Sequence, residues 1–119
     1  MIREFKKEIQ RVLLTIHDKV AFETVPESGF PYLVYDIPSS FFQEGLLNMT
    51  LDVDVWDRNS STVNVDTLST SVINALDRYH YHDTNIDFTV WFTSLLNVGS
   101  EDKTLKRMTC TFQVQLRRN

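Results

Sequence analysis

The sequence is poor in the residues that form cross-links and reactive sites. Its single cysteine, Cys110, excludes an intrachain disulfide and a zinc site built from several cysteines. Its three glycines form no phosphate-binding loop, no dinucleotide fingerprint and no turn around a catalytic serine. No apolar run reaches membrane-spanning length, and the charged first residues do not resemble a signal peptide. We therefore expect a soluble protein made in the cytoplasm, with no membrane contact, no cofactor and no enzyme activity.

Length and composition predict a single domain over residues 1–119. The chain has 119 residues, of which 42% are hydrophobic, and this is enough for one core. Its net charge of −4 is unevenly distributed, because both ends are basic and the segment between them is acidic. A mildly acidic chain does not suit sequence-independent binding of nucleic acid. The segments of opposite sign suit contacts between neighbouring subunits instead.

Two segments have the periodicity of amphipathic helices. Apolar residues recur at spacings of three and four from Ile2 to Ile16, which predicts a helix over about residues 2–18. A second helix is predicted from about Thr62 to Tyr79, with an acidic residue early and a basic one late, as the helix dipole favours. Each helix has one apolar stripe that must pack against another element.

Alternating apolar and polar residues predict strands over residues 31–37, 47–56, 86–93 and 108–116, and residues 20–25 form a short extended segment. The predicted order is α-β-β-β-α-β-β, an α+β fold whose mainly antiparallel sheet carries both helices on one face. The uncovered face would be polar but would include two tryptophans. Its predicted members are Asp52, Asp54, Trp56, Asp87, Thr89, Trp91, Thr93, Thr109, Thr111, Gln113 and Gln115.

Three connections are predicted from Pro, Gly and Ser content: a turn at residues 26–29, a loop at 38–45 and a loop at 97–105. The loop at 38–45 contains the adjacent aromatic residues Phe41 and Phe42, which is unusual for a loop. Large aromatic side chains on a loop or a polar face need cover, which either the monomer or a partner protein can provide. Both alternatives remain open for these two phenylalanines and for the tryptophans.

The acidic residues Asp36, Asp52, Asp54 and Asp57 are candidates for a metal centre, because hard cations need several oxygen ligands close together. Their spacing is not specific, and no ligand-rich loop accompanies them. We favour an acidic face exposed to solvent or to a lumen.

His80 and His82 form the one His-x-His pair and could hold a metal between them if their segment were extended. No third ligand lies nearby in the sequence, and a histidine near a helix C-terminus has a structural explanation. His17, at the end of the first helix, has the same explanation. Cys110 alternates in phase with apolar neighbours, which predicts a buried side chain rather than a reactive thiol.

The pattern resembles the tail-terminator and tail-to-head joining proteins of long-tailed phages, together with related tail-completion proteins of prophages. Three features carry the resemblance: the opening amphipathic helix, the strand FPYLVYDIP after a turn, and the strand and loop LDVDVWDRNSS before a second helix. The resemblance is architectural and spans most of the chain.

This resemblance implies a structural protein that forms a ring, a hexamer in the family. The ring caps the tail tube, stops its polymerisation and later joins the tail to the head. The implied partners are further copies of the chain, the tail-tube protein and a head-connector or neck protein, and DNA passes through without specific binding. The implied location is the head-proximal end of the virion tail, after synthesis in the host cytoplasm.

Only regional roles follow from the resemblance, which implies contacts through the loops at residues 41–45 and 98–106. We expect the candidate contact residues to be Phe41, Phe42, Gln43, Glu44, Trp56, Trp91, Glu101, Asp102, Lys103, Lys106 and Arg107. A neck protein on the head side remains an alternative within the same resemblance. Other classes also remain open: an interaction module unrelated to phages, or a small metal-binding or enzymatic domain that uses Asp36, Asp52, Asp54, His80 and His82.

Overall fold

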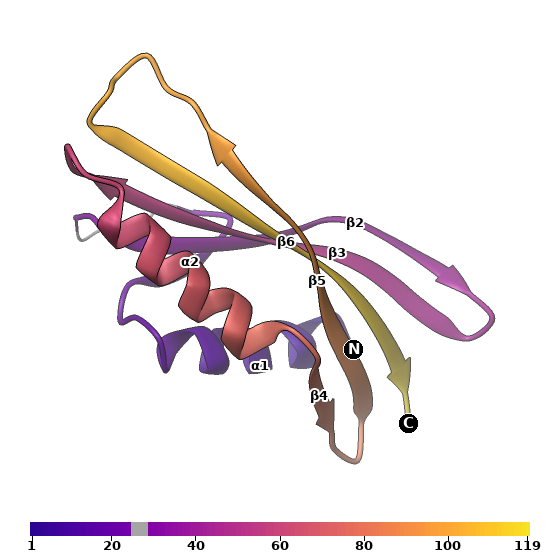
Figure 1. Ribbon diagram of the computed structural model, residues 1–119. Coiled ribbons are helices and arrows are strands. Elements are labelled where there is room, and N and C mark those ends of the chain that lie inside the picture. Colours follow the sequence, from indigo (N-terminus) through magenta and orange to yellow (C-terminus); the bar gives the residue numbers. More distant parts are fainter. Residues whose placement is uncertain (25–28) are drawn as a thin grey trace.

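The computed structural model describes residues 1–24 and 29–119, so most of the turn predicted at residues 26–29 lies outside the described residues. The described residues form two helices and six strands, and the α+β class is the predicted one (Figure 1). In chain order they are α1 (Ile2–Leu14), β1 (Val20–Phe22), β2 (Tyr32–Gln43), β3 (Leu46–Arg58), α2 (Val63–Leu76), β4 (Tyr79–His82), β5 (Ile86–Val98) and β6 (Leu105–Arg118). Neither helix is long and apolar enough to cross a membrane.

All six strands join one sheet in the order β1-β2-β3-β6-β5-β4. The β1–β2 pair is parallel, and every other pair is antiparallel. The molecule is elongated, with extents of 46 × 23 × 23 Å. Figure 1 shows the reason: the β2–β3 and β5–β6 hairpins project from the two ends of the twisted sheet in opposite directions.

The core lies between one face of the sheet and the two helices, which both cover that face (Figure 1). The apolar stripe of α1 supplies Phe5, Ile9 and Leu13, all fully buried. Phe5 meets Phe88 of β5 edge to face, with ring centroids 4.9 Å apart. Burial of each such side chain contributes about 1.5–3 kcal/mol. The apolar stripe of α1 thus packs into the core, as its amphipathic pattern predicts.

Strand β4 was not predicted. The second helix ends at Leu76 rather than near Tyr79, and Arg78 then adopts a positive φ of 63°. The chain therefore turns sharply and returns as an edge strand, with Tyr79 paired to Val90. The placement of His80 at a helix C-terminus was wrong, since it lies in β4.

The predicted loop at residues 38–45 was also wrong in most of its length. Strand β2 continues to Gln43, and Glu44 and Gly45 form a two-residue turn with positive φ at both positions. The strand continues because residues 39–43 pair with β3. Pro38, which made the segment resemble a loop, falls at a register shift between Asp36 and Ser39, where its missing N–H does not interrupt the ladder.

Candidate assembly surface

The face of the sheet without helices carries a band of carboxylates and hydroxyls. Asp52 accepts a hydrogen bond from Thr111 at 2.8 Å, and Asp54 accepts one from Thr109 at 2.5 Å. The register places Asp36 directly beside Asp52. Burial raises the pKa of Asp36, and the charges of Asp52 and Asp54 raise it further. This part of the face therefore carries concentrated negative charge, as the sequence predicted.

Trp56 is covered in part by its own chain. Arg107, its register partner on β6, holds its guanidinium 4.7 Å from the Trp56 ring centroid and donates to Asp54 at 3.0 Å. Tyr32 on the other side is buried, with its ring centroid 6.3 Å from that of Trp56. For this tryptophan, cover within the monomer is therefore the better of the two alternatives.

The carboxylates do not converge on a metal site. Asp57 alternates to the helix side of β3, where it is buried and accepts from Asn64 of α2 at 3.0 Å. Throughout residues 1–24 and 29–119, no three His, Cys, Asp or Glu side chains are placed to hold a metal ion together. Asp57 instead ties the end of β3 to the start of α2.

The two histidines of β4 lie on one face of an extended segment and share one carboxylate. His80 Nε2 is 2.9 Å and His82 Nδ1 is 3.1 Å from the two oxygens of Asp87. The hydrogen bonds from His80 and His82 lower the pKa of Asp87. The three side chains fasten the β4 edge strand to β5.

The β5–β6 loop, residues 99–104, is held to the end of β3. Arg58 donates to Asp102 at 2.6 Å, and the Asn59 N–H donates to the Thr104 carbonyl at 2.7 Å. Hydrogen bonds from Thr104 and Arg58 lower the pKa of Asp102 to about 2. The loop predicted at residues 97–105 is thus close to the observed one, and it is an ordered feature of this end of the molecule.

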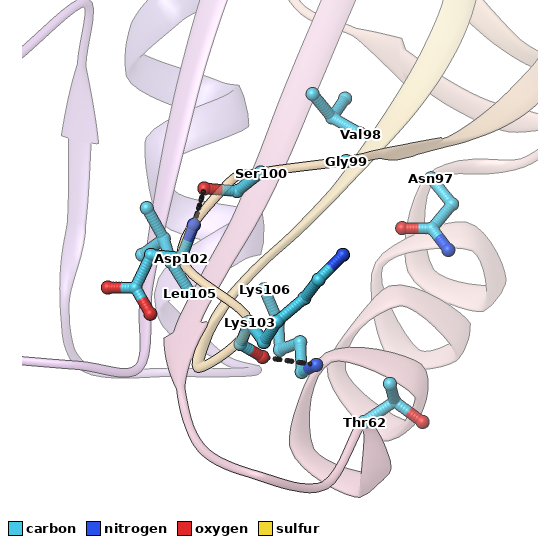
Figure 2. A pocket seen from close by; sticks show the side chains of 9 residues that line it. All are labelled: Thr62, Asn97, Val98, Gly99, Ser100, Asp102, Lys103, Leu105 and Lys106. Carbon is cyan, nitrogen blue, oxygen red and sulfur yellow. Dashed lines mark hydrogen bonds between the residues drawn. The ribbon is translucent and has the colours of Figure 1, made fainter.

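A hollow of about 190 Å³ lies between this loop and Thr62, just before α2, and Figure 2 shows the side chains that line it. Lys106 donates to the Lys103 carbonyl at 2.7 Å within this lining. Lys103 and Glu101 are exposed. The lining combines polar loop residues and two lysines with the apolar side chains of Val98 and Leu105. It holds no nucleophile paired to a base, so the hollow suits a protein contact better than a reaction.

Most of the exposed large apolar side chains lie on the two projecting hairpins, and Leu14 and Val63 on the helices are the others among the described residues. Phe41 and Phe42 lie in the outer part of β2, and Leu95 and Leu96 lie in the outer part of β5, with Trp91 between the hairpins. The sequence did not single out the two leucines. A signal was present, because the alternation of β5 breaks where the register shifts between Phe92 and Ser94, and two adjacent leucines follow.

The predicted contact residues thus form two groups at opposite ends of the sheet rather than one site. The residues at the β2–β3 tip are Phe41, Phe42, Gln43 and Glu44, and those at the β5–β6 end are Trp56, Glu101, Asp102, Lys103, Lys106 and Arg107. Trp91 lies in mid-sheet, opposite Gln113. One patch at each end is the arrangement that head-to-tail assembly requires.

Comparison with solved structures shows where this fold occurs. The chain is similar to a component of the virion of a native gene transfer agent particle, with a TM-score of 0.72 and 12% sequence identity over 93% of this chain and 92% of that chain. At this identity the likeness shows a shared fold. No protein-family model matches the sequence, and neither does any curated protein.

Proposed function

We propose that the protein is a structural, non-enzymatic component of a phage-like virion, and specifically a tail-completion protein that caps the tail tube. The observation that carries the proposal is the fold, which is similar over nearly the whole of both chains to a component of a gene transfer agent virion. The resemblance of the sequence to tail-terminator proteins supports the same assignment. The proposal assigns no catalysis to the protein, in keeping with the hollow beside Thr62 and the hollow beside Arg11, neither of which pairs a nucleophile with an activating base.

Head-to-tail assembly into a ring is the second part of the proposal. Such a ring needs two different patches on each subunit, and four of the exposed apolar residues, Phe41, Phe42, Leu95 and Leu96, lie on two hairpins that point in opposite directions. By the family resemblance the ring is a hexamer. Its partners are the tail-tube protein on one side and a head-connector or neck protein on the other.

The carboxylate band suits a ring that lets DNA pass. Asp36, Asp52 and Asp54 lie on the face that the helices leave open, and negative charge does not grip phosphate. We propose that this face lines the channel. The protein would then bind no DNA measurably at physiological salt.

The length of assembled tails tests the proposal. With the tail-tube protein and its length-determining factors present, tubes should be uniform in electron micrographs when this protein is added and should overgrow when it is withheld. Mass measurement on the purified protein should show a closed oligomer, alone or on the tube end. Uniform tubes formed without this protein would rule out tail capping.

A head-side neck protein is the alternative to tail capping. It would bind assembled heads rather than tubes, so sedimentation of the labelled protein with each kind of particle separates the two. Binding to heads alone would move the proposal to the head side while leaving the virion role intact.

A further inference from the structure

Each projecting hairpin leaves one strand edge unpaired. Strand β1 pairs β2 at residues 33–35, and the rest of β2, including Ser39–Gln43, has β3 on one side and, among the described residues, no strand on the other. Strand β4 pairs β5 at residues 87–90, and Ser94–Val98 has β6 on one side and no strand from residues 1–24 or 29–119 on the other. The two free stretches are equally long and lie on opposite edges, at opposite ends of the sheet.

Neither free edge has the usual protection against pairing. Natural edge strands are blocked by charged side chains, prolines or bulges along the exposed ladder. Between Ile37 and Gln43 and between Phe88 and Ser100 there is no Asp, Glu, Lys or Arg. Pro38 and both register shifts lie before the free stretches, which then run in continuous register. A long uncharged edge of this kind favours addition of another strand.

The backbone groups of the two edges are compatible. Gln43 and Leu46 flank a two-residue turn, so Gln43 faces β3 and the N–H and C=O groups of Phe42 and Ser40 point outward. On β5 the Phe92 N–H donates to Asp77, away from β6, at 2.9 Å. Phe92, Leu95 and Asn97 lie opposite alternate residues of β6, on both sides of the register shift. Alternate residues of an antiparallel pair have the same hydrogen-bonding direction, so the N–H and C=O groups of Leu95 and Asn97 also point outward.

Direction and side-chain faces also agree. Strands β2 and β5 run antiparallel within one subunit, so a neighbour placed beside the sheet without inversion presents its β2 antiparallel to this β5. We propose that β2 of one copy pairs with β5 of the next, with Phe42 opposite Leu95 and Phe41 opposite Leu96. In this register the outward N–H and C=O groups of Phe42 and Ser40 meet those of Leu95 and Asn97. The four exposed apolar side chains of the two edges then form two cross-strand pairs.

Charge complementarity supports a second copy as the occupant. In this register the neighbour's turn residue Glu44 reaches the corner where β4 begins, beside Arg78. Neither Glu44 nor Arg78 takes part in an ion pair among the described residues. Asp77, the other charge at this corner, already accepts the Phe92 N–H. The neighbour's β2 thus follows β4 end to end along β5 and completes its edge.

Cross-linking of variants that each carry one added cysteine tests this register. The inference rests on the proposed function, because the pairing would join neighbours in the proposed ring. Gln43→Cys and Ser94→Cys stand opposite each other in the register, in a pair without hydrogen bonds, whose Cα separation of about 4.5 Å permits a disulfide. A mixture of the two variants should give a disulfide-linked dimer under mild oxidation, and each variant alone should not. Native Cys110 is buried and does not compete.

Gln43→Cys mixed with Asn97→Cys is the matched control, because Asn97 lies on the opposite face and should not cross-link. Equal yields for the two mixtures, or a dimer of Gln43→Cys with itself, would overturn the proposed pairing. A second variant pair tests the affinity: Phe42→Asp should raise the dissociation constant of self-association at least about tenfold. Val63→Asp should leave it unchanged, although Val63 is as exposed (65%) as Phe42 (64%).

Light scattering on the same samples separates this inference from the proposed function. A closed oligomer without the 43–94 cross-link would overturn the strand pairing and leave the virion role standing. The cross-link in a protein that does not affect tube length would support the pairing and count against tail capping. A protein that stays monomeric at high concentration, or pairs only with tail-tube protein, would overturn the pairing between copies.

Discussion

The guanidinium of Arg107 lies over the indole of Trp56 while donating to Asp54, so one side chain joins an aromatic ring and a carboxylate on the open face of the sheet. We predict that Arg107→Leu lowers the free energy of unfolding by about 1–2 kcal/mol, since Asp54 loses a charged partner and Trp56 loses its cover. Urea unfolding measures the change. Arg117→Leu replaces an exposed arginine of the same strand and is the control. It should lower the free energy of unfolding by less than Arg107→Leu does. Equal losses would mean that the contact contributes nothing specific.

The second prediction concerns acid stability. Buried Glu8 of α1 accepts two hydrogen bonds from Arg11, at 2.8 and 2.7 Å, and one from Tyr79 of β4. The bonds from Arg11, with that from Tyr79, lower the pKa of Glu8 below its ordinary value of 4.5. A depressed folded-state pKa contributes stability above pH 4.5 that is lost as the pH falls through the folded value.

Glu8→Gln should therefore be less stable than the wild type at pH 7, and the difference should shrink as the pH falls below 4.5. Urea midpoints across this range provide the measurement, with Glu101→Gln on the exposed loop as the control. A difference between Glu8→Gln and the wild type that stays constant with pH would show that the ion pair is not the source.

The helices, the order of the long strands and the polar open face could be predicted because periodicity reports which face of an element is buried. The failures have local causes. In β4 the pattern YHYH carries two histidines, and the strand exists because Arg78 reverses the chain and Val90 offers a ladder partner. In β2 the Pro and Ser residues indicated a loop, and pairing with β3 overrode that preference.

The candidate site was less predictable than the fold, since it depends on which edges remain free. Phe41 and Phe42 were found because adjacent aromatics are conspicuous, but they were assigned to a loop. Leu95 and Leu96 were missed because exposure follows from the short length of β4, which leaves the outer part of β5 open. Sequence alone does not reveal where an edge strand stops.

The third prediction is that Cys110 is unreactive in the folded protein. Burial raises the pKa of its thiol to about 11, and its neighbours across the ladder are Val53 and Leu95. A thiol reagent at pH 8 should label the protein only in denaturant. Cys110→Ala should lower the free energy of unfolding by about 1 kcal/mol and leave assembly intact. Rapid labelling of the native protein, or lost assembly with an unchanged melting temperature, would indicate a functional thiol.

The fourth prediction is a charge exchange between subunits. Glu44→Arg or Arg78→Glu alone should weaken self-association about twofold to fivefold, as expected for one exposed ion pair. Both changes in the same chain should restore it, because each subunit then meets its neighbour with the signs reversed. Analytical ultracentrifugation at low and high salt gives the constants, and the difference should fade at high salt. If the combined variant is weaker than either single one, the two residues do not meet.

The last prediction separates the β5–β6 loop from the strands that it joins. Val98 pairs with Arg107, so an Asn-Gly turn in place of residues 99–106 would connect paired residues directly. The shortened protein should fold, because register is set by the alternation outside the deletion, although it loses the Arg58–Asp102 ion pair and the pairing of Leu105 and Lys106, the first residues of β6, with β3. The free edge of β5 also survives, so self-association should persist. Tail capping should fail, because exposed Glu101 and Lys103 and half-buried Lys106 are gone. Circular dichroism, light scattering and electron microscopy of tube lengths test these three outcomes, and normal tube lengths with the shortened protein would show that the loop is only a connection.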